Sequence, residues 1–483
     1  MARCALVWLC GVVCCQPARP QQAAAGAHAP TAPETKLEQR STTRHSVESG
    51  APDASGAPGA PAALRAPTPP QLDPDGDDDA PLADSSSGTP LAPGHFQRVG
   101  RAPAALQRIC DLTPFGDALY AAHATRPLGL DGASVTRYRP SSEPAGSHAP
   151  ASPFSLSFDW NRVGEPTRGG GAGQGFLRVH AIAGRLFVAD ADPPYNGFGI
   201  SEPGTEGFVF VSDAQGRFAR ARMPGHLPPP PPDASGKPGA AVLPRAYHVL
   251  DVIRFRGLLY AATGSVPPGQ RAWHGPSPAA LQVERELGAR FDYAADYPRP
   301  YRDGVWRFTF LVRFRDRLYA GLEDYDGREP NDYVYFEPPR EQSSIQEEDL
   351  HTARVRDGGA SQTLRWYADH GKLYWIAWNR AGVALRVTSD GDTWQLLSLP
   401  DDVGVPTDIV RFRGALHVLT SRALLRLNDA DVSAPSVLAR IDDKRSPFEL
   451  GDSFCAAPLA VFQNELYAGG QRDGALYRFV EGS

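Results

Sequence analysis

The sequence lacks the local motifs that mark most enzyme classes and structural metal sites. We find no GxSxG elbow, no HExxH pair, no phosphate-binding loop and no catalytic cysteine motif in its 483 residues. Only six cysteines are present, and four of them lie within the first fifteen residues. Because the chain has no CxxC pair and no Cys/His cluster of ligand spacing, the pattern argues against a structural zinc site.

A charge excess of one sign and long apolar runs are also missing. Lys and Arg number 49 against 55 Asp and Glu, which gives a net charge of -6, and no basic stripe is visible along the chain. Binding driven by phosphate charge needs such a stripe, so we expect no nucleic-acid partner. No segment reaches eighteen apolar residues, so the sequence predicts no transmembrane helix.

The first fifteen residues have the pattern of an export signal. Arg3 precedes an apolar run from Cys4 to Val13, and small residues follow. This order predicts a signal peptide over residues 1–15. The run that ends in Cys15 also resembles a bacterial lipobox, in which that cysteine is lipidated. We therefore expect a location outside the cytoplasm, either secreted or lipid-anchored through Cys15 at the cell envelope of a bacterium, with simple cleavage left open.

A tether follows the signal. Residues 16–94 consist mostly of Ala, Pro, Gly, Ser and Asp, with scarcely an aromatic side chain. Such a composition cannot bury enough apolar surface to offset the entropy that ordering removes. We expect a disordered linker over 16–94 and a folded domain over 95–483.

The rest of the chain repeats one short pattern seven times. Each copy has a two-residue turn, one further residue and a leucine, which an aromatic residue or histidine follows. The seven leucines are Leu119, Leu186, Leu259, Leu318, Leu373, Leu416 and Leu466. An apolar residue always lies seven positions before the leucine. The spacing, with insertions early in the chain, is near that of propeller blades, so we predict an all-β, seven-bladed β-propeller.

Closure of the ring can be predicted as well. Only one strand, 476–480, can be placed after Leu466, and Phe96 to Val99 can supply the strand that the last blade lacks. Cys110 opens the first blade and Cys455 opens the last, and these blades are neighbours in a closed ring. A disulfide between Cys110 and Cys455 would reinforce the closure, although two buried free thiols fit the sequence equally well.

One turn carries a family resemblance. The residues from Thr388 to Trp394 include two aspartates, a glycine and a closing tryptophan, and Ser212 to Phe218 is a fainter copy. This segment resembles the Asp-box turn of sialidase-like propellers. The resemblance implies a propeller fold, with the box as a structural turn remote from any chemistry.

Charged residues gather one position before the invariant apolar site of most repeats. Such positions and the ends of the second strands should share one face, at a solvated funnel entrance. The ligand-binding candidates on this face are Asp111, Arg178, Asp192, Asp251, Arg307, Glu323, Asp324, Asp326, Arg365, Trp378 and Asp408. Carboxylates beside aromatic rings suit a sugar, and long insertions at 263–304 and 323–351 rise near them.

We therefore expect a monomeric, non-catalytic binding module for a glycan or protein ligand. The alternative is a glycan-active hydrolase or lyase of sialidase-like type, in which Arg178, Arg307 and Arg365 would hold a carboxylate, with Asp192 as acid and Tyr325 as nucleophile. A purely structural envelope protein is a third reading. No catalytic residue is assigned and no cofactor is expected, except that calcium at the acidic 323–326 loop stays open.

Overall fold

The computed structural model describes residues 89–103, 106–124, 133–140, 153–160, 175–191, 207–220, 230–233, 235–243, 246, 248–264, 279–284, 291–297, 305–324, 330–355, 362–379, 381–428, 435–441, 446–450 and 454–482. The chain divides into two units, Met1–Thr68 and Pro69–Ser483. All described residues belong to the second unit. The predicted signal with Cys15, and the predicted tether as far as residue 88, lie outside them.

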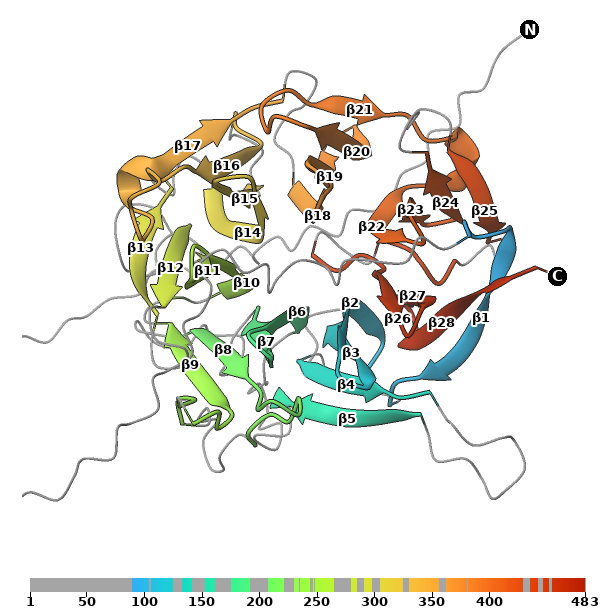
Figure 1. The fold of residues 1–483 in the computed structure, drawn as a ribbon, viewed down its shortest axis with the longest axis horizontal. Coiled ribbons are helices and arrows are strands. Elements are labelled where there is room, and N and C mark those ends of the chain that lie inside the picture. Colours follow the sequence, from blue (N-terminus) through green and yellow to red (C-terminus); the bar gives the residue numbers. More distant parts are fainter. Residues whose placement is uncertain are drawn as a thin grey trace, which may run out of the picture. The chain divides into compact units, whose positions relative to one another are not determined.

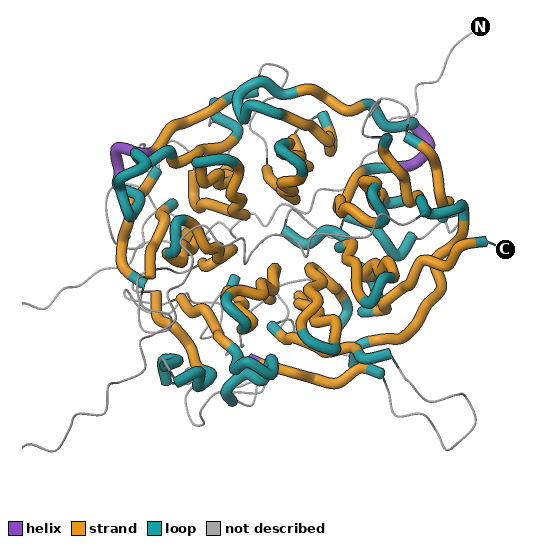
Figure 2. The backbone as a smooth tube through the Cα atoms, in the orientation of Figure 1, coloured by secondary structure: helices purple, strands orange, loops and turns teal. Residues whose placement is uncertain are grey.

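The described residues form antiparallel sheets that stand around a common centre, as expected of a β-propeller (Figure 1). Helical structure consists of short 3-10 turns such as Glu347–Asp349 and Asp401–Val403 (Figure 2). Five separate sheets have four strands each. They are β2 (Arg108–Phe115), β3 (Ala118–Ala124), β4 (Ser134–Tyr138), β5 (Phe154–Asp159); β6 (Phe176–Ile182), β7 (Arg185–Asp190), β8 (Gly207–Val211), β9 (Gly239–Leu243); β18 (Gln362–Asp369), β19 (Lys372–Asn379), β20 (Gly382–Thr388), β21 (Gln395–Leu397); β22 (Pro406–Phe412), β23 (Ala415–Thr420), β24 (Ala423–Leu427), β25 (Ser436–Arg440); and β26 (Leu459–Phe462), β27 (Glu465–Gly469), β28 (Ala475–Glu481), β1 (Gly94–Arg101).

The remaining strands join in one eight-stranded sheet, so the described residues show five separate four-stranded blades and do not confirm seven. This sheet contains β10 (His248–Phe255), β11 (Leu258–Gly264), β12 (Ala280–Glu284), β13 (Asp292–Asp296), β14 (Val305–Phe314), β15 (Arg317–Asp324), β16 (Tyr333–Phe336) and β17 (Leu350–Ala353). Its two halves meet at a single residue pair, Gly264 with Arg307. The physical reason is that β14 begins before the predicted inner strand, so its first residues reach the end of β11.

The sheet of β6 to β8 takes its fourth strand from further along the chain. Residues 217–220 form no strand, and the Asp213 carboxylate accepts the backbone N–H groups of Gln215 and Arg217 in a turn before them. The fourth strand of the sheet that contains β6, β7 and β8 is β9. The two segments expected as long insertions contain β12 and β13, and β16 with the start of β17, and all four strands belong to the eight-stranded sheet.

The predicted closure of the ring is confirmed. β1 lies beside β28 in antiparallel register, with Phe96 opposite Phe479, so the first described strand completes the last sheet. The structure also joins Cys110 and Cys455 by a disulfide across 345 positions of the chain. Leu91, ahead of β1, is buried in the same core region as Phe479. The closing sheet is therefore fixed by hydrogen bonds, by packing and by a covalent bond.

The hairpin turns explain the glycines and asparagine of the repeat. In five of the seven turns both central residues have positive φ, as in Arg413 (47°) and Gly414 (74°). Such turns match the right-handed twist of the paired strands, and they favour Gly or Asn. The turn residues therefore follow from backbone geometry.

The tyrosines that follow two of the leucines reach beyond their own hairpins. The Tyr260 hydroxyl accepts the backbone N–H of Ile345, which lies between β16 and β17, at 3.0 Å. Tyr319 lies so close to Gly391 that a Cβ atom there would be 2.1 Å from its hydroxyl oxygen. The repeated leucine-tyrosine pair thus holds adjacent blades together, and the core lies between the sheets.

Candidate functional site

Four charged residues of the inner strands form an ion cluster in the centre of the ring, which we call the axial cluster. It consists of Asp111 on β2, Arg178 on β6, Arg365 on β18 and Asp408 on β22. Asp111 Oδ1 lies 3.5 Å from Arg178 Nη1 and 3.1 Å from Arg365 Nη1. Arg365 Nε lies 3.5 Å from Asp408 Oδ1. The two arginines and two aspartates therefore compensate one another's charge.

The arginines of the axial cluster also bind backbone carbonyls across the ring. Arg178 donates to the carbonyl of Leu364 at 3.0 Å, and Arg365 donates to that of Cys110 at 2.6 Å. Each bond joins sheets that lie on opposite sides of the centre (Figure 1). The Arg178 guanidinium also lies 4.0 Å from the centroid of the Phe310 ring. These contacts fill the axis with protein groups.

The predicted solvated funnel entrance is wrong for these positions. The side chains of Asp111, Arg178, Arg365 and Asp408 are at most 15% exposed, and that of Asp251 is 2% exposed. Burial raises the pKa of Asp408 to about 6, against the opposing effect of the Arg365 guanidinium. Burial has this effect because it disfavours the charged form of a carboxyl group. These side chains are therefore buried in the centre of the ring and do not line a water-filled entrance.

Each of the three inner-strand aspartates holds the next inner strand along the chain. Asp111 on β2 accepts the backbone N–H of Val179 on β6 at 2.9 Å. Asp251 on β10 accepts that of Leu311 on β14 at 2.8 Å. Asp408 on β22 accepts that of Leu459 on β26 at 2.7 Å. In every case the donor is the invariant apolar residue of its repeat. The aspartates at this position of the repeat therefore join neighbouring inner strands.

Arg307 and Glu323 form a separate buried pair on β14 and β15. Arg307 Nε lies 2.6 Å from Glu323 Oε2, and the two side chains are 8% and 2% exposed. The Arg307 guanidinium lies 5.5 Å from the centroid of the Phe454 ring. Arg178 and Arg365 converge on Asp111, but Arg307 pairs with another carboxylate. Two of the three arginines considered for a sialidase-like cluster thus meet, around a carboxylate that the protein itself supplies.

Trp378 differs from the other predicted site residues whose side chains the structure describes, because it is exposed. It lies near the end of β19, away from the hairpin turn that begins this strand, and it is 40% exposed. Trp378 and Leu396, which is 49% exposed, are the large hydrophobic side chains that the described part of the chain leaves exposed. Of the other candidates, Asp192, Asp326 and Tyr325 lie outside the described residues, as does the side chain of Asp324.

His180 is a polar residue that the sequence patterns missed. Its Nε2 atom lies 2.6 Å from Asp251 Oδ1, and its side chain is 28% exposed while that of Asp251 is 2% exposed. The two residues are 71 positions apart in the sequence, and no spacing rule connects them. Both residues lie on inner strands of consecutive copies of the repeat, but the sequence does not show that these two side chains meet.

The turn that resembles an Asp box is held by its first aspartate. Asp390 Oδ1 accepts the backbone N–H groups of Asp392 at 2.8 Å and Thr393 at 2.7 Å, and these bonds lower the pKa of its carboxyl group. Trp394 donates to the Tyr333 hydroxyl at 2.9 Å. The segment therefore acts as a structural turn between β20 and β21, and membership of the sialidase-like superfamily does not follow from it.

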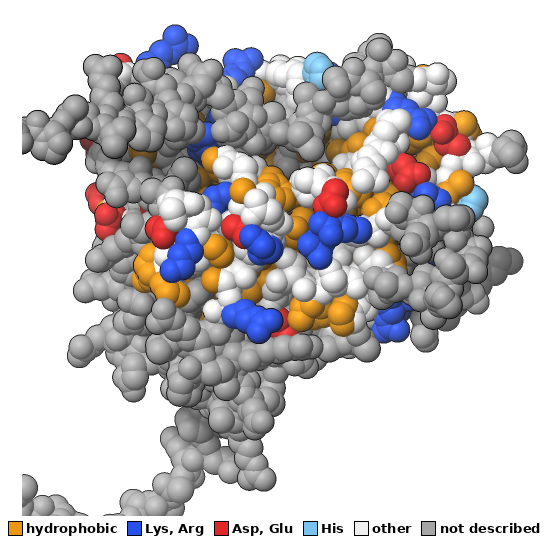
Figure 3. Space-filling model, turned by 60° about the horizontal axis from the view of Figure 1, so that its bottom comes forward, with side chains coloured by type: hydrophobic (Ala, Val, Ile, Leu, Met, Phe, Trp, Pro, Cys, Tyr) orange, Lys and Arg blue, Asp and Glu red, His pale blue; other side chains and the backbone are white. Residues whose placement is uncertain are grey.

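Charges of both signs are interspersed on the surface in view in Figure 3, where blue and red side chains alternate. Within the described residues, no group of three or more His, Cys, Asp or Glu side chains is placed to hold a metal ion. A search of the same residues for a helix with the length and apolarity to cross a membrane finds none.

No family model matches the chain, and no curated protein matches it. Solved structures of similar fold include a streptogramin B lyase (8% identity, TM-score 0.47, 80% of this chain and 98% of that one). Virginiamycin B lyase from Staphylococcus aureus has 8% identity and a TM-score of 0.45, with 80% and 98% covered. BamB from Moraxella catarrhalis has 13% identity and a TM-score of 0.34, with 80% and 97% covered. At such identities the likeness concerns the fold, and activity does not transfer with it.

Proposed function

We propose that the chain is an exported β-propeller that binds a glycan or a protein ligand at the face around Trp378, without catalysis. We count the eight-stranded sheet as two blades joined at Gly264 and Arg307, which gives seven. We also keep the Asp-box interpretation of residues 388–394 as part of this proposal. The propeller then serves as a rigid frame for its loops.

The observation that carries the proposal is the position of Asp111. Its carboxylate lies between Arg178 and Arg365 and takes the place that a substrate carboxylate would need in a sialidase-like site. A charge that is buried and already paired stabilises the fold and offers little to a ligand. Ligand contacts then fall to exposed groups, and a tryptophan is well suited because rings stack on sugars and anchor protein interfaces.

Export is supported by independent features. The amino terminus has the order of a signal peptide, and a disulfide such as that between Cys110 and Cys455 persists in oxidising compartments. We propose that Cys15 is lipidated and that the linker lets a monomeric propeller stand away from a bacterial envelope. Mass spectrometry of the mature protein tests this, because a lipid on Cys15 adds a defined mass and simple cleavage adds none.

The binding proposal is tested with the full mature chain on a glycan array and in a capture experiment with envelope proteins. We expect Trp378→Ala to lose at least about tenfold in affinity for the ligand found, since a buried aromatic anchor contributes more than about 1.4 kcal/mol. The matched control is Leu396→Ala, which removes another exposed apolar side chain and should leave binding unchanged. Turnover of a glycan from the same panel, or equal loss in both variants, overturns the proposal.

A further inference from the structure

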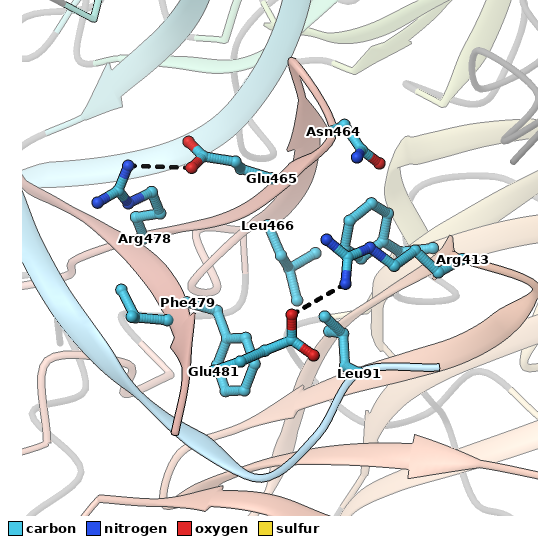
Figure 4. Close-up of a pocket in the computed structure, with 10 residues that line it drawn as sticks. Leu91, Arg413, Asn464, Glu465, Leu466, Arg478, Phe479 and Glu481 are labelled. Carbon is cyan, nitrogen blue, oxygen red and sulfur yellow. Dashed lines mark hydrogen bonds and ion pairs between the residues drawn. The ribbon is translucent and has the colours of Figure 1, made fainter. Parts of the chain in front are cut away.

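A small cavity lies at the seam where the ring closes, on the side of the hairpin turns. Its volume is about 180 Å³, and it lies between the β22–β23 turn, the β26–β27 turn and strands β27 and β28 (Figure 4). Arg413 and Asn464 come from two hairpin turns, and Glu465, Arg478 and Glu481 come from β27 and β28. The volume is below the roughly 300 Å³ of drug-sized pockets and equals that of about six water molecules.

The charged groups of the cavity form two separate ion pairs. Arg413 Nη1 lies 3.0 Å from Glu481 Oε2, and Arg478 Nη1 lies 3.0 Å from Glu465 Oε1 (Figure 4). The side chains of these pairs are between 23% and 40% exposed, so water or a ligand can reach them. The lining therefore carries two positive and two negative charges and is neutral as a whole.

The pairs leave hydrogen-bonding capacity unused. The four carboxylate oxygens of Glu465 and Glu481 each accept one bond, from Tyr467, Arg478, Ala92 and Arg413. A carboxylate oxygen has two lone pairs, so each can accept a second bond. The side chains of Arg413 and Arg478 are partly exposed, and a guanidinium group donates hydrogen bonds. The lining thus offers a ligand both donors and acceptors.

The floor of the cavity is apolar. Phe412 and Leu466 are each 1% exposed, and Leu91 and Phe479 are nearly as deeply buried. Packing in the closing sheet holds these side chains, so the floor is preformed. A ligand with a flat apolar face and polar groups around its edge would fit both the floor and the rim.

We propose that this seam cavity binds one residue of a neutral sugar or a similar polyol. A hydroxyl group donates to a carboxylate and accepts from a guanidinium at the same time, so it can use a paired site without separating the pair. A charged ligand would lie close to the two side chains of the lining that carry its own sign of charge, and they would repel it. The site lies on the other face from Trp378, and its occupancy does not depend on the function proposed there.

The test uses the full mature chain and isothermal titration with glucose, galactose and N-acetylglucosamine as neutral probes. Glucuronate and glucosamine are the matched charged probes, because each keeps the ring and adds one charge. We expect at least one neutral sugar to bind, and its charged counterparts to bind at least about tenfold more weakly. Absence of binding by all three neutral sugars, or preference for a charged one, overturns the proposal.

Two variants locate the binding site. Asn464 has a φ of 59°, so Asn464→Gly keeps the turn and removes only the amide. Glu465→Gln removes the charge of one pair and is matched by Glu449→Gln, since Glu449 pairs with Arg472 outside the cavity at similar exposure. Either cavity variant should weaken sugar binding about tenfold with an unchanged melting temperature, and Glu449→Gln should not. Unchanged sugar binding in both cavity variants means that the sugar binds elsewhere and the proposal is wrong.

Discussion

The carboxylate of Asp251 on β10 accepts the backbone N–H of Leu311 on β14, at 2.8 Å. Asp251 Oδ1 also lies 2.6 Å from His180 on β6. A single buried side chain thereby connects three inner strands. The same kind of bond runs from Asp111 to Val179 and from Asp408 to Leu459. These aspartates are structural joints of the ring.

Asp251→Ala should destabilise the propeller by about 2 to 3 kcal/mol. The reason is that the variant leaves the buried N–H of Leu311 without its acceptor. Urea unfolding measures the change. Asp402, whose exposed pair with Arg440 lies at the surface, provides the control: Asp402→Ala should stay within about 0.5 kcal/mol of the parent. Equal losses in the two variants would show that Asp251 is no special joint.

The disulfide should contribute roughly 3 to 5 kcal/mol to stability. A bond between Cys110 and Cys455 closes a loop of 345 positions and restricts the unfolded chain. Urea unfolding with and without a reductant measures this contribution. The Cys110→Ser/Cys455→Ser double variant should match the reduced parent and show no response to reductant. A parent whose stability is unaffected by reduction contradicts the prediction.

His123 should make the fold acid-sensitive between about pH 6.5 and pH 4. Burial lowers the pKa of His123 to about 4, while its Nδ1 lies 2.9 Å from the Arg108 carbonyl oxygen and its Nε2 lies 2.7 Å from Thr136 Oγ1. Because the folded pKa is below the unfolded value, the stabilisation is complete above pH 6.5 and falls as the pH drops toward 4. The loss should be about 3 kcal/mol, and His123→Gln should remove this part of the pH profile. A parent profile that His123→Gln leaves unchanged would falsify the assignment.

Asp408 should act in the opposite direction. Its folded pKa of about 6 is above the unfolded value, so its protonated form favours folding. This contribution is complete below about pH 4 and is lost as the pH rises through 6. Asp408→Asn should therefore remove a loss of stability between about pH 4 and pH 6, so that the free energy of unfolding of the variant falls less, or rises more, with pH than that of the parent. Chemical unfolding at several pH values measures this, and a variant whose free energy of unfolding falls more with rising pH than that of the parent would contradict it.

Gly391→Ala should destabilise more than Gly414→Ala. Both glycines have positive φ, 88° and 74°, so both variants strain the backbone by about 1 kcal/mol or more. Only at Gly391 would the new Cβ meet the Tyr319 hydroxyl, and at Gly414 nothing lies within 4 Å. Combining Gly391→Ala with Tyr319→Phe should recover part of the loss, which a double-mutant cycle on melting curves measures. An additive cycle would show that the contact is unimportant.

The sequence alone determined the class of the fold and the way in which it closes. Repeated leucines with turn residues before them specify hairpins locally, so the inner strands, the strand at Phe96 to Val99 and the pairing of the last sheet could be predicted. The apolar positions before each leucine, such as Val179 and Leu311, are buried for the same reason. These features depend on short-range spacing, which a sequence displays directly.

Only the tertiary structure decided what the charged residues do. Arg178 meets a carbonyl 186 positions away, and Asp251 meets an N–H 60 positions away, so no local spacing can reveal these partners. The charged side chains of the axial cluster could bind a ligand if they faced water, but in the centre of the ring they pair with one another. Trp378 lies near the end of β19 and is 40% exposed, which its place in the sequence does not show. Burial and pairing are properties of the closed ring, and the order of residues does not contain them in readable form.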